Sequence, residues 1–185
     1  MGVEETRSGV LASGGGSNLA AILAAGLPVV AVIVDRPCGA TAVAEAAGLP
    51  AELVSRGPDR LELTHRVVDA LERHRADLVV MAGYMTILDK PIFDAFGDRV
   101  LNTHPSLLPS FPGAHAVRDA LAAGVKVTGC TVHVATPEVD RGPILAQEAV
   151  PVLPGDTVET LHERIKAVEH RLYPDTIRRF VEGSG

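Results

Sequence analysis

Short apolar runs rich in β-branched residues alternate with segments of helical periodicity along the whole chain. The run PVVAVIV at 28–34 is apolar at every position, which is typical of a parallel strand buried on both faces. The segment DRLELTHRVVDALERHR at 59–75 instead spaces its apolar residues as a helix does. Repeated strand–helix units predict an α/β, Rossmann-like fold, in which a mostly parallel twisted sheet carries helices on both faces.

The same patterning places the remaining elements. Strands are expected at 10–13, 28–34, 51–54, 77–83, 99–104, 126–136 and 143–152, and helices at 18–26, 41–48, 59–75, 89–95, 117–124 and 156–180. The short turn PEVDRG between the last two strands predicts an antiparallel pair at the sheet edge. The closing helix should be capped by Asp156 or Thr157 and bent at Pro174. Because no repeat or linker interrupts the pattern, residues 1–185 are expected to form a single domain.

Composition excludes several classes of protein. A chain of 185 residues with 46% hydrophobic residues has enough apolar side chains for one substantial core. Its formal net charge of −6 argues against a nucleic-acid partner, because phosphate binding needs a basic surface. No apolar run approaches membrane length, so no membrane partner is expected. The two cysteines lie far apart without metal-ligand spacing, which predicts no disulfide, no metal site and a reducing cytoplasmic location.

The glycine-rich segment SGGGSNL at 13–19 follows the first strand and begins the first helix. Exposed N–H groups at such a helix start form an anion site, most simply for a terminal phosphate. A dinucleotide site is the alternative, with Gly14, Gly16 and Asp35 in the required order, although Leu19 occupies the third glycine position. A plain strand–helix turn without a ligand remains a third interpretation.

The stretch NTHPSLLPSFPG at 102–113 carries three prolines and no charge. Asn102 and His104 lie two residues apart at the end of a predicted strand, so their side chains should share a face. Pro105 restricts His104 to extended backbone. Ligand crevices of open α/β sheets form at the carboxyl ends of the strands, which favours a functional pair over a histidine satisfied by backbone alone.

A third polar group is expected from the turn at 136–143, which offers Asp140 and Glu138. A carboxylate beside His104 would favour its protonated form and make it a better proton donor. His133 is a rival to His104, but its place in an apolar strand suggests that it only lines a pocket. No serine or cysteine lies in a nucleophile elbow, so a covalent enzyme intermediate is not expected.

Taken in order, SGGGSNL, MAGYMTIL, LNTHPSLLPSFPG, TVHVATPEVDRGPIL and ERIKAVEHRLYP resemble the folate-dependent formyltransferases, and among them the phosphoribosylglycinamide formyltransferases. The resemblance covers almost the whole chain. It implies 10-formyltetrahydrofolate as formyl donor, the amine of glycinamide ribonucleotide as acceptor, a place in purine synthesis, and no metal. The added domains of the tRNA-modifying and deformylase members are not expected here.

The resemblance also implies residue roles. The catalytic trio would be Asn102, His104 and Asp140. The ribonucleotide would contact Gly16, Ser17, Asn18, Leu19, Lys166 and Glu169, with Glu169 as the partner of its amine. The folate would lie against Arg60, Met85, Thr86, Ile87, Leu88, Asn102, Thr136, Pro137, Glu138, Val139 and Asp140. The N-terminal half would thus bind the ribonucleotide, and the C-terminal half would hold the folate pocket and catalytic residues.

Two positions depart from the family pattern, because Thr86 stands where arginine is common and Gly15 where a polar residue is common. Two functions from other classes stay open beside this one. An NAD-dependent oxidoreductase would use the glycine loop with Asp35, and a non-catalytic nucleotide-binding module would use the loop alone.

Overall fold

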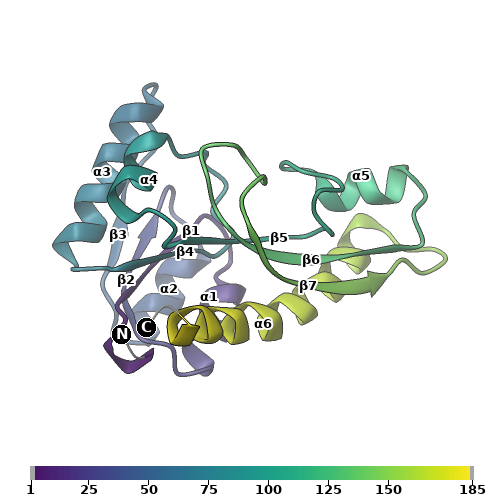
Figure 1. The fold of residues 1–185 in the computed structure, drawn as a ribbon, viewed down its shortest axis with the longest axis horizontal. Coiled ribbons are helices and arrows are strands. Elements are labelled where there is room, and N and C mark those ends of the chain that lie inside the picture. The colour runs from purple at the N-terminus through teal and green to yellow at the C-terminus, as the bar shows by residue number, and fades with distance from the viewer. Residues whose placement is uncertain (1–2, 184–185) are drawn as a thin grey trace.

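The computed structural model describes residues 3–183, which form one seven-stranded sheet flanked by helices (Figure 1). The strands are β1 (Ser8–Ala12), β2 (Val29–Val34), β3 (Ala51–Leu53), β4 (Leu78–Met81), β5 (Val100–His104), β6 (Val127–Val134) and β7 (Ile144–Pro151). The helices are α1 (Ser17–Ala24), α2 (Gly39–Ala46), α3 (Arg60–Arg73), α4 (Lys90–Phe96), α5 (Ala116–Ala122) and α6 (Val158–Gly183), with a 3-10 turn η1 (Val3–Glu5) before β1.

The strand order is β3-β2-β1-β4-β5-β6-β7. The first five strands pair in parallel, whereas β6 runs antiparallel to β5 and β7 antiparallel to β6. The predicted fold class and the late antiparallel pair are therefore confirmed. Strand β1 begins two residues earlier than its apolar run, because Ser8 and Gly9 are buried against the sheet. A Cβ on Gly9 would lie 2.3 Å from a methyl carbon of the fully buried Leu71, so a larger residue there would force the packing of Leu71 to change.

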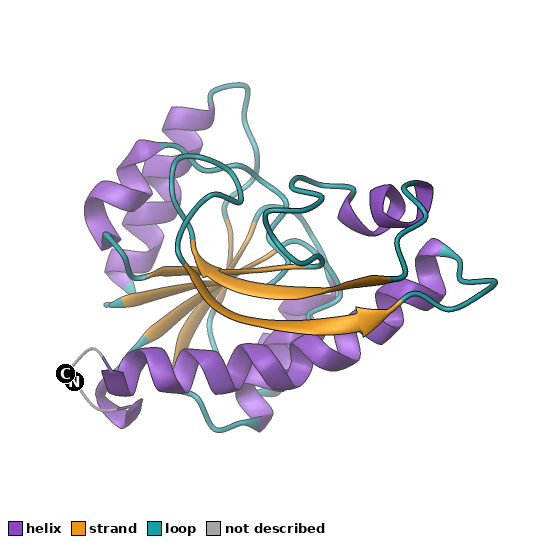
Figure 2. Ribbon diagram, turned by 45° about the vertical axis from the view of Figure 1, so that its right-hand side comes forward, coloured by secondary structure: helices purple, strands orange, loops and turns teal. Residues whose placement is uncertain are grey.

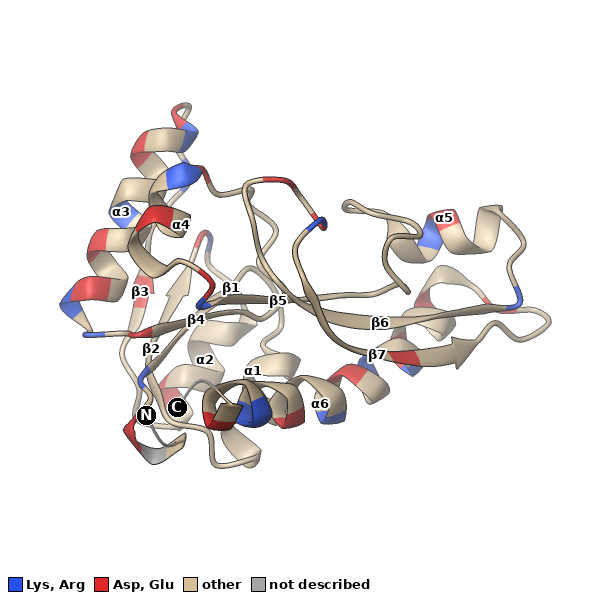
Figure 3. Cartoon of the chain, viewed as in Figure 1, with Lys and Arg blue, Asp and Glu red and all other residues tan. Residues whose placement is uncertain are grey.

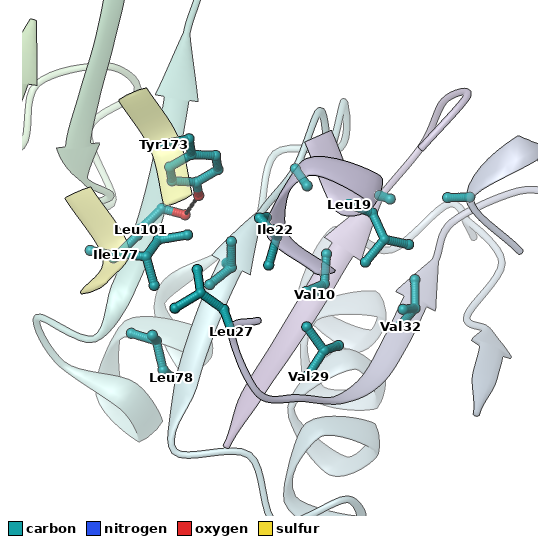
Figure 4. Close-up of a cluster of buried hydrophobic side chains, with 14 of the residues drawn as sticks. Val10, Leu19, Ile22, Leu27, Val29, Val32, Leu78, Leu101, Tyr173 and Ile177 are labelled. Carbon is teal, nitrogen blue, oxygen red and sulfur yellow. Dashed lines mark hydrogen bonds between the residues drawn. The ribbon is translucent and has the colours of Figure 1, made fainter. Parts of the chain in front are cut away.

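Helices cover both faces of the parallel part of the sheet, as Figure 2 shows. On one face α1, α2 and α6 enclose a cluster that includes Val10, Ile22 and Ile177 (Figure 4). On the other face α3 and α4 pack over Leu11, Ile33 and the rest of a second cluster. Alternate residues of β1 thus enter different cores, which explains why its pattern is apolar at successive positions.

Helix α6 crosses the sheet from the antiparallel pair to the parallel half. Thr157 caps it, since Thr160 N donates to Thr157 Oγ1 at 3.3 Å and Thr157 N donates to Thr160 Oγ1 at 2.9 Å. Asp156 instead pairs with Arg164. The fully buried Tyr173 donates its hydroxyl to the Leu101 carbonyl at 2.9 Å, which ties the helix to β5.

Charged residues lie mainly on the outer helices and on loops, and few fall on the central strands (Figure 3). Within residues 3–183, no helix is long and apolar enough to cross a membrane.

Candidate active site

The end of β5 presents its side chains to opposite faces of the sheet. Asn102 and His104 face one side, where their partners across the antiparallel ladder are His133 and Thr131 of β6. Thr103 faces the other side and donates to the buried Glu169 carboxylate at 3.3 Å. The structure therefore places Asn102 and His104 on one face, as the two-residue spacing predicts.

Asp140 reaches His104 from the loop between β6 and β7, which arches back over the sheet (Figure 1). Its Oδ2 lies 3.4 Å from His104 Nδ1 and accepts from Gly113 N at 2.7 Å. Both side chains of the His104–Asp140 pair are 6% exposed, so little water separates the two groups. The rival carboxylate Glu138 is exposed, and Asp140 is the acid that the fold brings to the histidine.

His133 forms part of this cluster rather than only lining it. Its Nε2 lies 3.2 Å from Asn102 Nδ2 and 3.7 Å from Asp140 Oδ1, and its Nδ1 lies 3.0 Å from the Val134 carbonyl oxygen. Burial lowers the pKa of His133, which favours the neutral ring. In the tautomer that satisfies both hydrogen bonds, Nδ1–H donates to the Val134 carbonyl and Nε2 accepts from Asn102, so the amide nitrogen of Asn102 has a fixed direction.

The proline-rich turn is fastened by a hydroxyl that sequence reasoning missed. Thr131 Oγ1 donates to the Ser106 carbonyl at 2.6 Å and accepts from Leu108 N at 3.0 Å and from Gln147 Nε2 at 2.9 Å. Gln147 on β7 also donates to the Leu108 carbonyl at 2.9 Å. The turn thereby brings the Phe111 carbonyl oxygen within 2.9 Å of His104 Nε2. Both ring nitrogens of His104 consequently face acceptors.

The glycine-rich loop leads into α1 as expected. Gly16, the N-cap residue, has φ 83°, and a Cβ there would lie 2.8 Å from Ala40 Cα, so both backbone and space require glycine. No side chain caps the helix, which leaves its first N–H groups available to an anion. A Cβ at Gly15 would meet open space, so nothing around that position explains its glycine.

Helix α6 brings the two other predicted ribonucleotide residues beside this loop. Glu169 is 5% exposed, and Asn18 Nδ2 donates to its Oε2 at 3.3 Å. Burial raises the pKa of Glu169, although the hydrogen bonds from Asn18 and Thr103 oppose the shift. Lys166, one turn earlier, pairs with Glu163 at 2.8 Å. Leu19 is fully buried in the core, so only its backbone can reach a ligand.

Asp35 cannot act as the ribose-binding acid of a dinucleotide site. Its side chain is fully buried and accepts from Arg36, Arg56 and Thr86. Burial works against its ionisation, but hydrogen bonds from these three residues and Ser13 outweigh burial and hold the pKa of this carboxyl well below its usual range. The oxidoreductase interpretation loses its acidic residue. The Thr86 hydroxyl is engaged with Asp35, although Thr86 also lines the neighbouring cavity.

The two segments predicted to enclose the folate expose apolar side chains. Met85 is 55%, Ile87 49% and Val139 46% exposed, whereas Leu88 is buried and anchors its segment. A cavity of about 300 Å³ lies beside 85–87, and its walls also include Arg56, Gly57, Pro58, Arg60 and Leu63. Such a surface suits a flat, partly apolar ligand with a polar end. Within 3–183 no cluster of three or more histidine, cysteine or acidic side chains could hold a metal ion.

Comparisons with known proteins agree on one family. Residues 6–177 match the family model described as "Formyl transferase". Phosphoribosylglycinamide formyltransferase of Mycobacterium tuberculosis is 52% identical over 170 residues, which cover 88% of this chain and 79% of that protein. The crystal structure of glycinamide ribonucleotide transformylase 1 from Symbiobacterium toebii superimposes with a TM-score of 0.94 at 48% identity, covering 96% of this chain and 88% of that one.

A formyltetrahydrofolate deformylase from Pseudomonas syringae shares the fold with a TM-score of 0.90 at 30% identity. The match covers 96% of this chain and 62% of the deformylase. The fold alone therefore does not separate transfer of a formyl group from its hydrolysis.

Proposed function

The chain belongs to the formyl transferase family, in its phosphoribosylglycinamide formyltransferase branch, and from this premise we propose how its residues share the reaction. The enzyme transfers the formyl group of 10-formyltetrahydrofolate to the amine of glycinamide ribonucleotide in purine biosynthesis. The observation that carries the proposal is the buried cluster in which Asp140 contacts His104, and Asn102 faces the same side of β5.

The amine of the ribonucleotide attacks the formyl carbon directly, and negative charge develops on the formyl oxygen. One of the two hydrogens on Asn102 Nδ2 bonds to His133, and the other donates to the formyl oxygen. The His104 imidazolium is the second donor to that oxygen. His104 donates through Nε2–H, which the Phe111 carbonyl oxygen accepts before the substrates arrive. As the carbon–nitrogen bond to the folate breaks, the proton on Nε2 passes to the leaving N10 nitrogen.

Asp140 keeps His104 oriented during these steps. Its Oδ2 lies 3.4 Å from Nδ1, so a negative charge stands beside the ring while positive charge is present on it. Proton balance is restored when the attacking amine, cationic in the tetrahedral intermediate, releases a proton to water or back to His104. Every step uses side chains already in place, and no covalent enzyme intermediate is formed.

The two substrates occupy opposite halves of the site. The phosphate of the ribonucleotide binds the free N–H groups of Gly16, Ser17 and Asn18 at the start of α1. Lys166 and Glu169 bind the rest of that substrate, and Glu169 accepts a hydrogen bond from its amine. The pterin lies between Met85–Leu88 and the loop from Thr136 to Asp140, with Arg60 near the folate tail. The cytoplasmic location stays a prediction from the unpaired cysteines.

The test compares single-turnover formyl transfer in wild type, Asn102→Ala, His104→Ala and, as a matched control, His65→Ala on the exposed side of α3. Loss of one oxyanion donor should lower kcat by about 10²–10³ for Asn102→Ala. His104→Ala should lose more, because it removes a charge and a proton source together. The control should keep the wild-type rate.

Two results would count against the proposal. If His104→Ala is impaired no more than His65→Ala, the histidine takes no part in the reaction. If wild type releases formate from the donor at the same rate without the ribonucleotide, water rather than the amine is the acceptor, as in the deformylase relative.

A further inference from the structure

Arg56 and Arg60 line the cavity beside 85–87, and Arg36 shares with Arg56 the ion-pair partner Asp35. These three arginines differ in how their charge is compensated. Arg60 makes a bidentate pair with Asp89, at 2.6 and 2.8 Å, so one cation meets one anion. Arg36 and Arg56 both pair with the single carboxylate of Asp35, at 2.9 and 2.8 Å. Two guanidinium groups thus share one negative charge, and one positive charge is left over at this end of the cavity.

Arg56 is held in a fixed orientation rather than left free in solvent. Its Nε and Nη2 both lie 2.8 Å from Asp35 Oδ2, and that carboxylate is fully buried, whereas the Arg56 side chain is 45% exposed. A guanidinium carries five N–H donors, and these two contacts leave the Nη1 donors unused. Arg56 also lines the cavity, next to Thr86 and Gly57. Arg36 pairs with the same Asp35 carboxylate but does not line the cavity.

We propose that Arg56 binds a carboxylate of the glutamate tail of the formyl donor, and that buried Asp35 is its positioning residue. The inference rests on the proposed placement of the pterin between 85–88 and 136–140. A donor with its ring system there carries its charged tail outward past the cavity mouth, where the uncompensated guanidinium lies. Guanidinium–carboxylate contacts are short, charge-assisted and often bidentate, so a preoriented arginine suits this ligand better than a mobile lysine would.

The experiment measures KM for two formyl donors, one with a single glutamate and one ending at the pteroate carboxyl without glutamate. Arg56→Gln should raise KM for the glutamate-bearing donor by about 10- to 100-fold, the range expected for a lost charge-assisted hydrogen bond. It should leave KM for the pteroate donor within about 2-fold, because the lost contact lies beyond the part that both donors share.

Arg36→Gln is the matched control. Like Arg56→Gln, it removes one guanidinium that pairs with Asp35, but Arg36 does not line the cavity. Because this change also removes the surplus charge but leaves the donors of Arg56 in the cavity, KM for the glutamate-bearing donor should rise clearly less than in Arg56→Gln, and KM for the pteroate donor should stay near that of wild type. Inorganic phosphate at the concentration of the donor should not compete with the glutamate-bearing donor in wild type, which separates a tail site from a general anion site.

Three outcomes would overturn the inference. Arg56→Gln could raise KM equally for both donors, could change neither, or could match Arg36→Gln. An Ile87→Trp variant tests the pterin placement separately: if it binds both donors as wild type does, the placement itself is wrong. If Ile87→Trp weakens both donors while Arg56→Gln weakens neither, the placement stands and only the role of Arg56 is rejected.

Discussion

Replacing Asp140 by asparagine removes one charge from the buried cluster around His104 and almost no volume. Asp140 has φ 55°, a left-handed backbone that asparagine adopts readily, so the loop should keep its shape. The new amide oxygen can still accept from Gly113 N, as the carboxylate does at 2.7 Å. The change therefore tests the charge beside His104 and little else.

Coulomb's law bounds the size of the effect. Two unit charges 3.4 Å apart interact by about 5 kcal/mol at an effective dielectric constant of 20. The net loss should be about 1.4–4 kcal/mol, which is below the Coulomb figure because solvent partly compensates for the missing charge. At pH 7.5 we expect kcat/KM for Asp140→Asn to fall by about 10- to 10³-fold.

Single-turnover transfer at saturating concentrations of both substrates gives the sharper result. Asp140→Asn should lower this rate, because the carboxylate faces the His104 ring at 3.4 Å and fixes its orientation. Asp98→Asn, which removes one negative charge from an exposed turn, controls for net charge. A single-turnover rate in Asp140→Asn that equals that of wild type, or that falls no further than in Asp98→Asn, would refute the assignment of Asp140 as the residue that positions His104.

Three further results are expected. Burial raises the pKa of Glu169 above its unfolded value, so the wild-type protein loses stability as pH rises through the folded pKa. Glu169→Gln should therefore have a higher Tm than wild type at pH 7.5 but not near pH 4, and a gain of about 1 kcal/mol would appear as about 2–4 °C by calorimetry. Burial, with a smaller contribution from Glu169, raises the pKa of the Cys130 thiol to about 12, so iodoacetamide should label only the partly exposed Cys38 in the folded protein, and mass spectrometry of the labelled peptides would reveal any other pattern. A Cβ at Gly39 would lie 3.0 Å from the Gly15 carbonyl oxygen, so Gly39→Ala should raise KM for the ribonucleotide several-fold and leave KM for the donor unchanged; an equal rise in both would mean that the substitution disturbs more than the loop.

The fold was predictable because its information is local. Each strand and helix shows its own periodicity, and the Asn102–His104 pair follows from two-residue alternation within one strand. Thr157 could be named as a helix cap for the same reason, since its partner Thr160 is three residues away. The resemblance then supplied roles that spacing alone does not give.

Contacts that depend on strand order were not predictable. Thr86 reaches Asp35 because β2 and β4 both pair with β1, and Arg56 reaches it because β3 pairs with β2. No periodic signal states which strands are neighbours. His133 seemed a lining residue because the antiparallel register that sets it opposite Asn102 is a property of the assembled sheet. A polar residue within an otherwise apolar strand was the one available sign.

Thr131 has a consequence for anyone who redesigns this enzyme. The Thr131 hydroxyl joins the proline-rich turn to the edge strand β7 through Gln147. Substitutions on that edge strand can therefore also move the proline-rich turn that carries His104. Thr131→Val or Gln147→Leu would fill the same space and remove the connection. Such variants should fold, bind both substrates and transfer formyl slowly, and a screen for solubility or binding would pass them unnoticed.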